Sequence, residues 1–166
     1  MPTNIKIDLN CVLGLVFVAG FVGGIVIGYI NFTRHGTPIV RNVIPHLDYV
    51  SRLTNAEEIA EELEKALKAL EPYSGNPVCA CPTLETNFDY IKSVMKKLIE
   101  DAREVSQLRR DDYEYQQFIH NAHNLAKELE KNLKYAAEAY FVGPFLVGWG
   151  IAAVALLVAA FKTIVY

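Results

Sequence analysis

Residues 11 to 30 read CVLGLVFVAGFVGGIVIGYI, and this apolar stretch decides the class of the protein. It lies within a longer run, from Leu9 to Thr33, that contains no charged side chain. A helix needs about 20 apolar residues to cross a hydrocarbon core about 30 Å thick. A cleaved signal peptide has a shorter apolar centre and a basic start, whereas here Lys6 is offset by Asp8. We therefore predict a retained transmembrane helix over residues 11–32.

A second uncharged run covers residues 139 to 161, AYFVGPFLVGWGIAAVALLVAAF. Aromatic residues gather near the ends of both runs, as they do at membrane–water interfaces: Tyr29, Phe32, Tyr135, Tyr140, Phe141 and Tyr166. Trp149 lies deep in this run and needs a partner for its N–H, which predicts a packed helix. Neither run contains an ionisable Asp, Glu, Lys, Arg or His, which argues against a pump or a secondary transporter.

The fold class that follows is an all-α integral membrane protein. Its two transmembrane helices, residues 11–32 and 139–161, flank an extramembrane helical hairpin or coiled-coil bundle over residues 33–138. Short tails are expected at residues 1–10 and 162–166.

Gly20, Gly24 and Gly28 recur every four residues in the first apolar run. This spacing places them on one stripe of a helix, where the missing side chains let another backbone approach closely. The sequence leaves open whether that contact is within the chain or between copies. Glycine is also common in membrane helices without such a role.

The segment between the two runs has the composition of a soluble helical bundle. Residues 33–53 are expected to be a connector with one short helix after Pro45. Thr54 and Glu57 match a capping box, which predicts a helix over residues 54–71. Its apolar residues repeat at helical spacing: Ala56, Ala60, Leu63, Leu67 and Leu70. A loop over residues 72–82 follows, and Thr83 is the expected cap of the next helix.

Residues 83–138 carry two apolar series that differ in phase. The first series is Leu84, Phe88, Ile91, Met95, Leu98, Ala102 and Val105, and the second is Leu108, Tyr115, Phe118, Ala122, Leu125, Leu129 and Leu133. Either a turn near Arg109 to Asp112 separates two helices, or one helix continues with a local phase change. The absence of glycine and proline from residues 84–141 favours one rod of about 84 Å, whose apolar face would need a second copy.

Both apolar runs enter the same membrane, so the chain that leaves the first run must return to the same side to enter the second. We call this condition chain parity. The number of helical runs between them must therefore be even. A helix over 54–71 with one long returning helix satisfies this condition. A four-run bundle whose first limb is residues 34–52 satisfies it as well.

Four residues could hold a metal ion: Cys79, Cys81, His120 and His123. Two sulfurs and two nitrogens suit tetrahedral zinc, but the spacing departs from the usual ligand patterns. Helical geometry turns both histidines away from the face of Ala122 and Leu125, which favours solvated histidines and a loop thiol pair. Cys11 is interpreted as a small apolar residue, and no cofactor is expected.

The formal net charge is −3, with 16 Lys and Arg against 19 Asp and Glu, which gives no basis for nucleic-acid binding. No common catalytic or phosphate-binding motif occurs, so an enzyme is not expected. The preferred function is an oligomeric scaffold or accessory subunit in the lipid bilayer, associated with copies of itself or with other membrane subunits. The alternatives are a membrane sensor or receptor with a helical-bundle domain and a small oligomeric channel.

Basic residues near the apolar runs indicate the side of the membrane on which the middle domain lies. Lys6, Lys162 and the amino group lie on the terminal sides. Five basic residues lie on the side of the middle domain: Arg34, Arg41, Lys127, Lys131 and Lys134. Five basic residues on the side of the middle domain, against three positive groups on the terminal sides, favour a cytoplasmic domain.

Overall fold

The computed structural model describes residues 9–78 and 82–165, and every regular element in these ranges is helical. The chain divides into two compact units. Unit 1 contains α1 (Leu9–Asn31) and the part of α6 (Tyr113–Val165) that begins at Phe141. Unit 2 is Phe32–Tyr140. Helix α6 belongs to both units, because its 53 residues run through the boundary.

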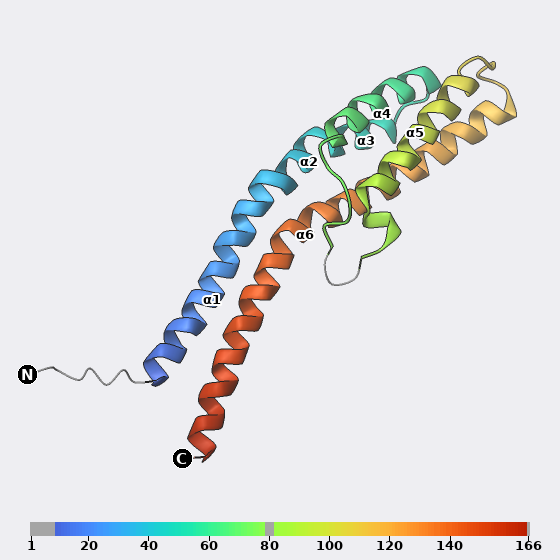
Figure 1. Ribbon diagram of the computed structural model, residues 1–166. Coiled ribbons are helices and arrows are strands. Elements are labelled where there is room, and N and C mark those ends of the chain that lie inside the picture. Colours follow the sequence, from blue (N-terminus) through green and yellow to red (C-terminus); the bar gives the residue numbers. More distant parts are fainter. Residues whose placement is uncertain (1–8, 79–81, 166) are drawn as a thin grey trace, which may run out of the picture. The chain divides into compact units, whose positions relative to one another are not determined.

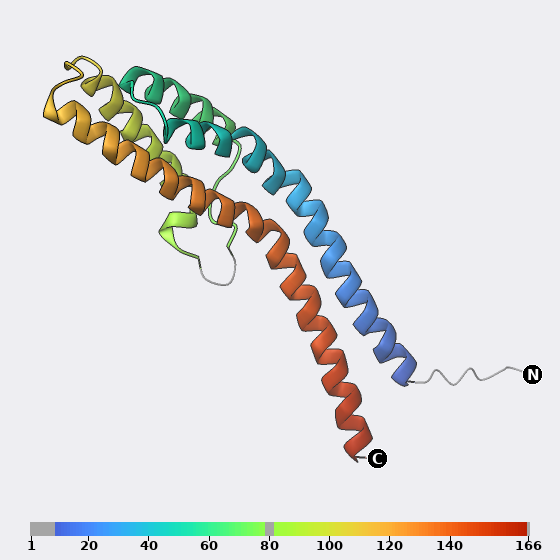
Figure 2. The same cartoon turned by 180° about the vertical axis from the view of Figure 1, so that it is seen from behind.

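In unit 1, α1 and the last part of α6 lie side by side and antiparallel (Figure 1, Figure 2). Both helices are long and apolar enough to cross a membrane, by length and composition. Their outward side chains are apolar and exposed: Leu15 by 70%, Val147 by 65% and Leu157 by 66%. Water-soluble proteins seldom expose a continuous apolar surface of this kind.

The first limb of unit 2 is helical almost throughout, which corrects the expected connector over residues 33–53. It comprises the π-helix η1 (Phe32–Gly36), α2 (Thr37–Asn42) and α3 (Ile44–Val50). Pro38 and Pro45 each lie in the first turn of a helix, where the missing N–H costs nothing and the fixed φ angle suits the helix. The prolines therefore begin helices here instead of interrupting them.

Helix α4 (Ala56–Leu70) lies within the predicted range 54–71, but its cap differs from the prediction. The side chain of Asn55, and not Thr54, accepts the Glu57 backbone N–H at 3.1 Å. Four of the five predicted apolar residues are buried, and Leu67 is half-buried. Ile59 and Ala66 are buried in addition.

Polar side chains order the described part of the loop between α4 and α5. Gly75 adopts a φ of 67°, and its N–H donates to the Asp89 carboxylate at 2.9 Å. The Asn76 amide donates to the Thr83 carbonyl and to the hydroxyl of the buried Thr86. Such local side-chain bonds replace the regular backbone pairing that a loop lacks.

Helix α5 (Phe88–Val105) begins later than predicted. Thr83 precedes the short 3₁₀-helix η2 (Leu84–Thr86), and Asn87 caps α5 by accepting the N–H groups of Asp89 and Tyr90. Leu84 is consequently 67% exposed and lies outside the core in which it was expected. From Phe88 to Ala102 the predicted apolar series is buried.

A turn separates α5 from α6, so the continuous rod over residues 83–138 is wrong. Helix α5 ends at Val105 and α6 begins at Tyr113. Within the turn, the Asp112 carboxylate accepts the Arg109 backbone N–H at 3.1 Å. Aspartate makes such bonds readily, and a turn therefore needs neither glycine nor proline.

The chain folds back into a bundle with one hydrophobic core, to which α2, α3, α4, α5 and the first part of α6 contribute. Within the described ranges, the runs between the two apolar helices are the limb of residues 32–50, α4, α5 and α6, as chain parity requires. Because α5 and α6 bury their apolar faces in this core, the argument that a rod would need a second copy no longer holds.

Two hydrogen bonds of Tyr115 tie α6 to the start of α4. The Tyr115 hydroxyl accepts the Ala56 N–H at 2.9 Å and donates to the Thr54 carbonyl at 3.2 Å. Tyr115 is only 3% exposed and the bond from Ala56 is buried, so water cannot replace that bond.

Candidate functional site

The predicted metal ligands do not form a described site. Cys79 and Cys81 lie outside the described residues. His120 is exposed, and its Nε2 lies 3.1 Å from Asn124 Nδ2. His123 is half-buried, and its Nε2 donates to the Leu53 carbonyl at 2.6 Å, so it does not face solvent as expected. Among the described residues, no group of three or more His, Cys, Asp or Glu side chains could hold a metal ion.

The predicted glycine stripe lies against the second apolar helix in the same chain. A Cβ atom built on Gly24 would be 3.0 Å from the Gly148 Cα and 3.3 Å from the Pro144 and Phe145 carbonyl oxygens. A Cβ built on Gly20 would be 3.1 Å from the Ile151 side chain and 3.2 Å from the Gly148 carbonyl oxygen. Apart from the Ile151 side chain, these neighbours are backbone atoms, which cannot move aside as a flexible side chain can. The contact therefore depends on glycine.

Gly28 extends this contact toward the start of the second apolar run. A Cβ on Gly28 would be 2.8 Å from the Phe141 carbonyl oxygen. A Cβ on Gly148 would be 2.6 Å from the Gly24 Cα, so glycines face each other across the interface. Close backbone approach of this type is the usual basis of helix association in membranes, where apolar burial supplies no driving force.

Aromatic rings line one edge of the same helix pair. Phe21 of α1 meets Phe145 edge-on, with ring centroids 6.3 Å apart, and Phe145 stacks with Phe141 at 5.9 Å. The Trp149 ring lies 6.5 Å from that of Phe21 but is 53% exposed. The helix that carries Trp149 therefore packs against α1, as predicted, although about half of the Trp149 side chain is exposed.

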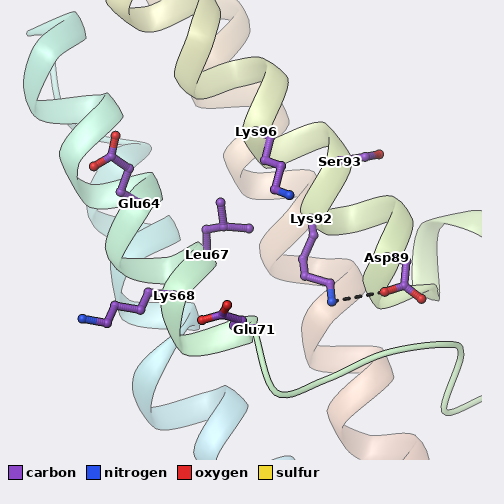
Figure 3. Close-up of a pocket in the computed structure, with 8 residues that line it drawn as sticks. All are labelled: Glu64, Leu67, Lys68, Glu71, Asp89, Lys92, Ser93 and Lys96. Carbon is purple, nitrogen blue, oxygen red and sulfur yellow. Dashed lines mark ion pairs between the residues drawn. The ribbon is translucent and has the colours of Figure 1, made fainter.

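Unit 2 carries a groove of about 480 Å³ between α4 and α5 (Figure 3). Leu67 of α4 points toward α5 and forms its apolar floor. The other lining residues are polar or charged: Glu64, Lys68, Glu71, Asp89, Lys92, Ser93 and Lys96. The groove thus combines one half-buried apolar side chain at its floor with charged rims of both signs.

Some of these charges already have partners, and others do not. Lys92 Nζ lies 3.1 Å from the Asp89 carboxylate and donates to the Tyr73 carbonyl at 2.7 Å. Hydrogen bonds from the Gly75 N–H and from Lys92 lower the pKa of Asp89, so this carboxyl stays ionised. Lys68, Glu71 and Lys96 make no ion pair with any residue in the described ranges. These three charges are available to a partner.

A second ionic cluster joins α3 to α4. Glu62 receives Lys65 Nζ at 2.6 Å through one carboxylate oxygen and lies 2.6 Å from His46 Nδ1 through the other. The hydrogen bond from Lys65, and then that from His46, lowers the pKa of Glu62 against the opposing effect of burial. This cluster holds two helices together and leaves no charge directed at a ligand.

Sequence reasoning did not identify the α4–α5 groove as a candidate site. It placed Leu67 in the core, yet this side chain is half-buried at the groove floor. Lys92 and Lys96 lie four residues apart beside the apolar series of α5, a pattern that could have indicated a basic rim along that helix. The facing rim on α4 depends on how α4 and α5 pack, which the sequence did not show.

No protein-family model, curated protein or solved structure matches this chain.

Proposed function

We propose that this chain is a non-enzymatic, two-pass membrane protein that serves as an accessory subunit or scaffold of a membrane complex. The observation that carries the proposal is the contrast between the two units. The helices of unit 1 expose their apolar side chains, whereas unit 2 buries its own in one core and exposes charged residues. The two surfaces suit two solvents, with lipid around unit 1 and water around unit 2.

The α4–α5 groove supports a docking role for unit 2. An amphipathic helix places apolar residues at spacings of three and four, with charged residues on either side of that stripe. Such a helix would set its apolar stripe on Leu67 and its acidic residues beside Lys96. Its basic residues would lie beside Glu71. A partner helix of this composition is the occupant that we propose.

A partner subunit is favoured over a second copy of this chain. The earlier reason for self-association was an uncovered apolar face on a long rod. Helices α5 and α6 cover those faces within one chain. The surface that remains for contact between copies is therefore the outer face of the two apolar helices.

Extraction of native membranes tests the first part of this proposal. Alkaline carbonate should leave the chain in the membrane pellet, and a mild detergent should release it together with other subunits. Release by carbonate would rule out membrane-spanning helices.

Mass determination of the detergent-solubilised complex tests the second part. Lys96→Glu should remove the associated subunit, whereas Lys127→Glu, an exposed site on α6 outside the groove, should retain it. A single chain without any partner would contradict the accessory role. A complex of identical chains would favour the small channel or the homo-oligomeric scaffold instead.

A further inference from the structure

Residues 9–47 contain no Asp or Glu, although they include Arg34 and Arg41. All of these residues lie in the described part of the chain. Many other basic residues of unit 2 have a carboxylate partner, such as Arg52 with Asp48 and Arg103 with Glu64. Arg34 and Arg41 make no ion pair with any residue that the structure describes. The first limb of unit 2 is therefore a basic surface with uncompensated charge.

The packing of this limb directs both arginines outward. Gly36 is buried, and a Cβ there would lie 2.7 Å from the Ala137 carbonyl oxygen of α6. Ile39 is fully buried in the core. Arg41 comes two residues after Ile39, which is about 200° around an α-helix. Arg34 and Arg41 are accordingly exposed, while the opposite side of the limb packs against the bundle.

A ring contact fixes the position of η1 on α6. The His35 ring stacks on that of Tyr140, with centroids 5.1 Å apart. The backbone that carries Arg34 is therefore held in place by the two residues that follow it, His35 and Gly36. A guanidinium group on a fixed backbone loses less conformational entropy when it binds an anion.

We propose that Arg34 binds the phosphate of an anionic phospholipid headgroup, with Arg41 adding a longer-range attraction. This inference rests on the proposed membrane-spanning role of α1. Arg34 lies three residues beyond Asn31, the last residue of α1, so the chain keeps its backbone within about 11 Å of that residue. The headgroup layer on each side of a bilayer is roughly 5–8 Å thick. This short reach puts the Arg34 guanidinium group within range of the headgroup phosphates.

Arg41 lies in α2, seven residues farther along the chain than Arg34. An exposed charge acts on an anionic surface over a Debye length of about 8 Å at physiological salt. Arg41 should therefore attract an anionic surface without contacting a single phosphate. Arginine suits the contact position because its planar group binds two phosphate oxygens at once.

The test uses the full chain in detergent, titrated with phosphatidylglycerol or with phosphatidylcholine, with bound lipid counted by native mass spectrometry. The wild type should prefer phosphatidylglycerol. Arg34→Gln should lower that preference about fivefold, the effect expected of one basic residue at an anionic surface. Arg41→Gln should lower it less. The control Arg52→Gln, an exposed arginine paired with Asp48, should leave it unchanged.

Inorganic phosphate in the same titration distinguishes a lipid site from a free-phosphate site. It should not displace phosphatidylglycerol at equal concentration, because the acyl chains contribute to lipid binding. Displacement, equal binding of the two lipids, or equal loss in Arg34→Gln and Arg52→Gln would overturn the inference. A chain that resists carbonate extraction but shows no lipid preference would contradict this inference alone. Release by carbonate would instead contradict the membrane-spanning role.

Discussion

Replacement of Gly24 by leucine tests the contact between the two apolar helices directly. The first atom of the new side chain would meet the Gly148 Cα at 3.0 Å and two carbonyl oxygens at 3.3 Å. Because even the Cβ would meet backbone atoms at these distances, the helices must separate to admit the side chain. Overfilling a well-packed contact typically costs about 1–3 kcal/mol.

Helix propensity acts in the opposite direction to packing, so the experiment distinguishes the two effects. Leucine is a better helix former than glycine by nearly 1 kcal/mol. Gly23→Leu is the matched control, because a Cβ at Gly23 would have no neighbour within 4 Å. We expect Gly24→Leu to weaken the contact and Gly23→Leu to leave it intact or stabilise it. The two variants should differ by about 1–3 kcal/mol.

The assay is disulfide cross-linking in membranes between cysteines placed at Phe21 and Phe145, whose rings contact each other across the two helices. The background lacks the three native cysteines. The cross-link within one chain should form readily in the wild type and in Gly23→Leu, and poorly in Gly24→Leu. Equal yields in the two leucine variants would refute the glycine contact. Cross-links mainly between copies would show that the contact is intermolecular.

Three further predictions concern unit 2. Tyr115→Phe should cost about 2 kcal/mol, because the buried Ala56 N–H loses its partner and the Thr54 carbonyl loses its donor, and the midpoint of thermal denaturation should fall by roughly 8–10 °C. Tyr113→Phe, at a residue that is 79% exposed, should leave the midpoint unchanged, and equal midpoints for the two variants would contradict this role of the hydroxyl. Leu98→Asp should destabilise the bundle by several kcal/mol, because Leu98 is only 5% exposed and the new carboxylate would be buried. The exposed Lys97→Asp should have a small effect in the same denaturation assay, and equal losses of stability would mean that the wrong face of α5 was assigned to the core. Glu62→Gln should reduce stability near neutral pH but not in acid, because the folded state lowers the pKa of Glu62 below its ordinary value of 4.5. The stabilisation from the Glu62 carboxylate is therefore fully present above pH 4.5 and is lost as the pH falls through the folded-state pKa. Denaturation as a function of pH should show the advantage of the wild type vanish in acid, with the exposed Glu61→Gln as the control, and an advantage that persists in acid would exclude the carboxylate as its source.

Periodicity predicted the helices of unit 2 well, because burial selects apolar residues at helical spacing. The spacing from Phe88 to Ala102 identified the buried face of α5. The ends of the helices were less well predicted, because several residues in a row could serve as the cap. Thr54 and Asn55 are both good caps, and only the backbone conformation at Asn55 decides between them.

The connections were the weakest part of the prediction, because they depend on single side-chain bonds. Asp112 stabilises a turn in a segment where the absence of glycine and proline favoured a continuous helix. Residues 33–53 were expected to form a connector with one short helix after Pro45, although proline is suited to the first turn of a helix and Pro38 lies in such a turn as well. The α4–α5 groove was missed for a different reason, since its rims come from two helices whose packing was unknown.

We propose that the chain crosses the membrane twice and that the domain of residues 33–138 lies on one side. Protease-cleavable tags at both ends can be combined with an impermeant thiol reagent applied to intact cells to establish this topology. Both tags should be cleaved from outside, while Cys79 and Cys81 should react only after the membrane is opened. Tags on opposite sides of the membrane would contradict two crossings, and ready labelling of both cysteines on intact cells would place the domain outside.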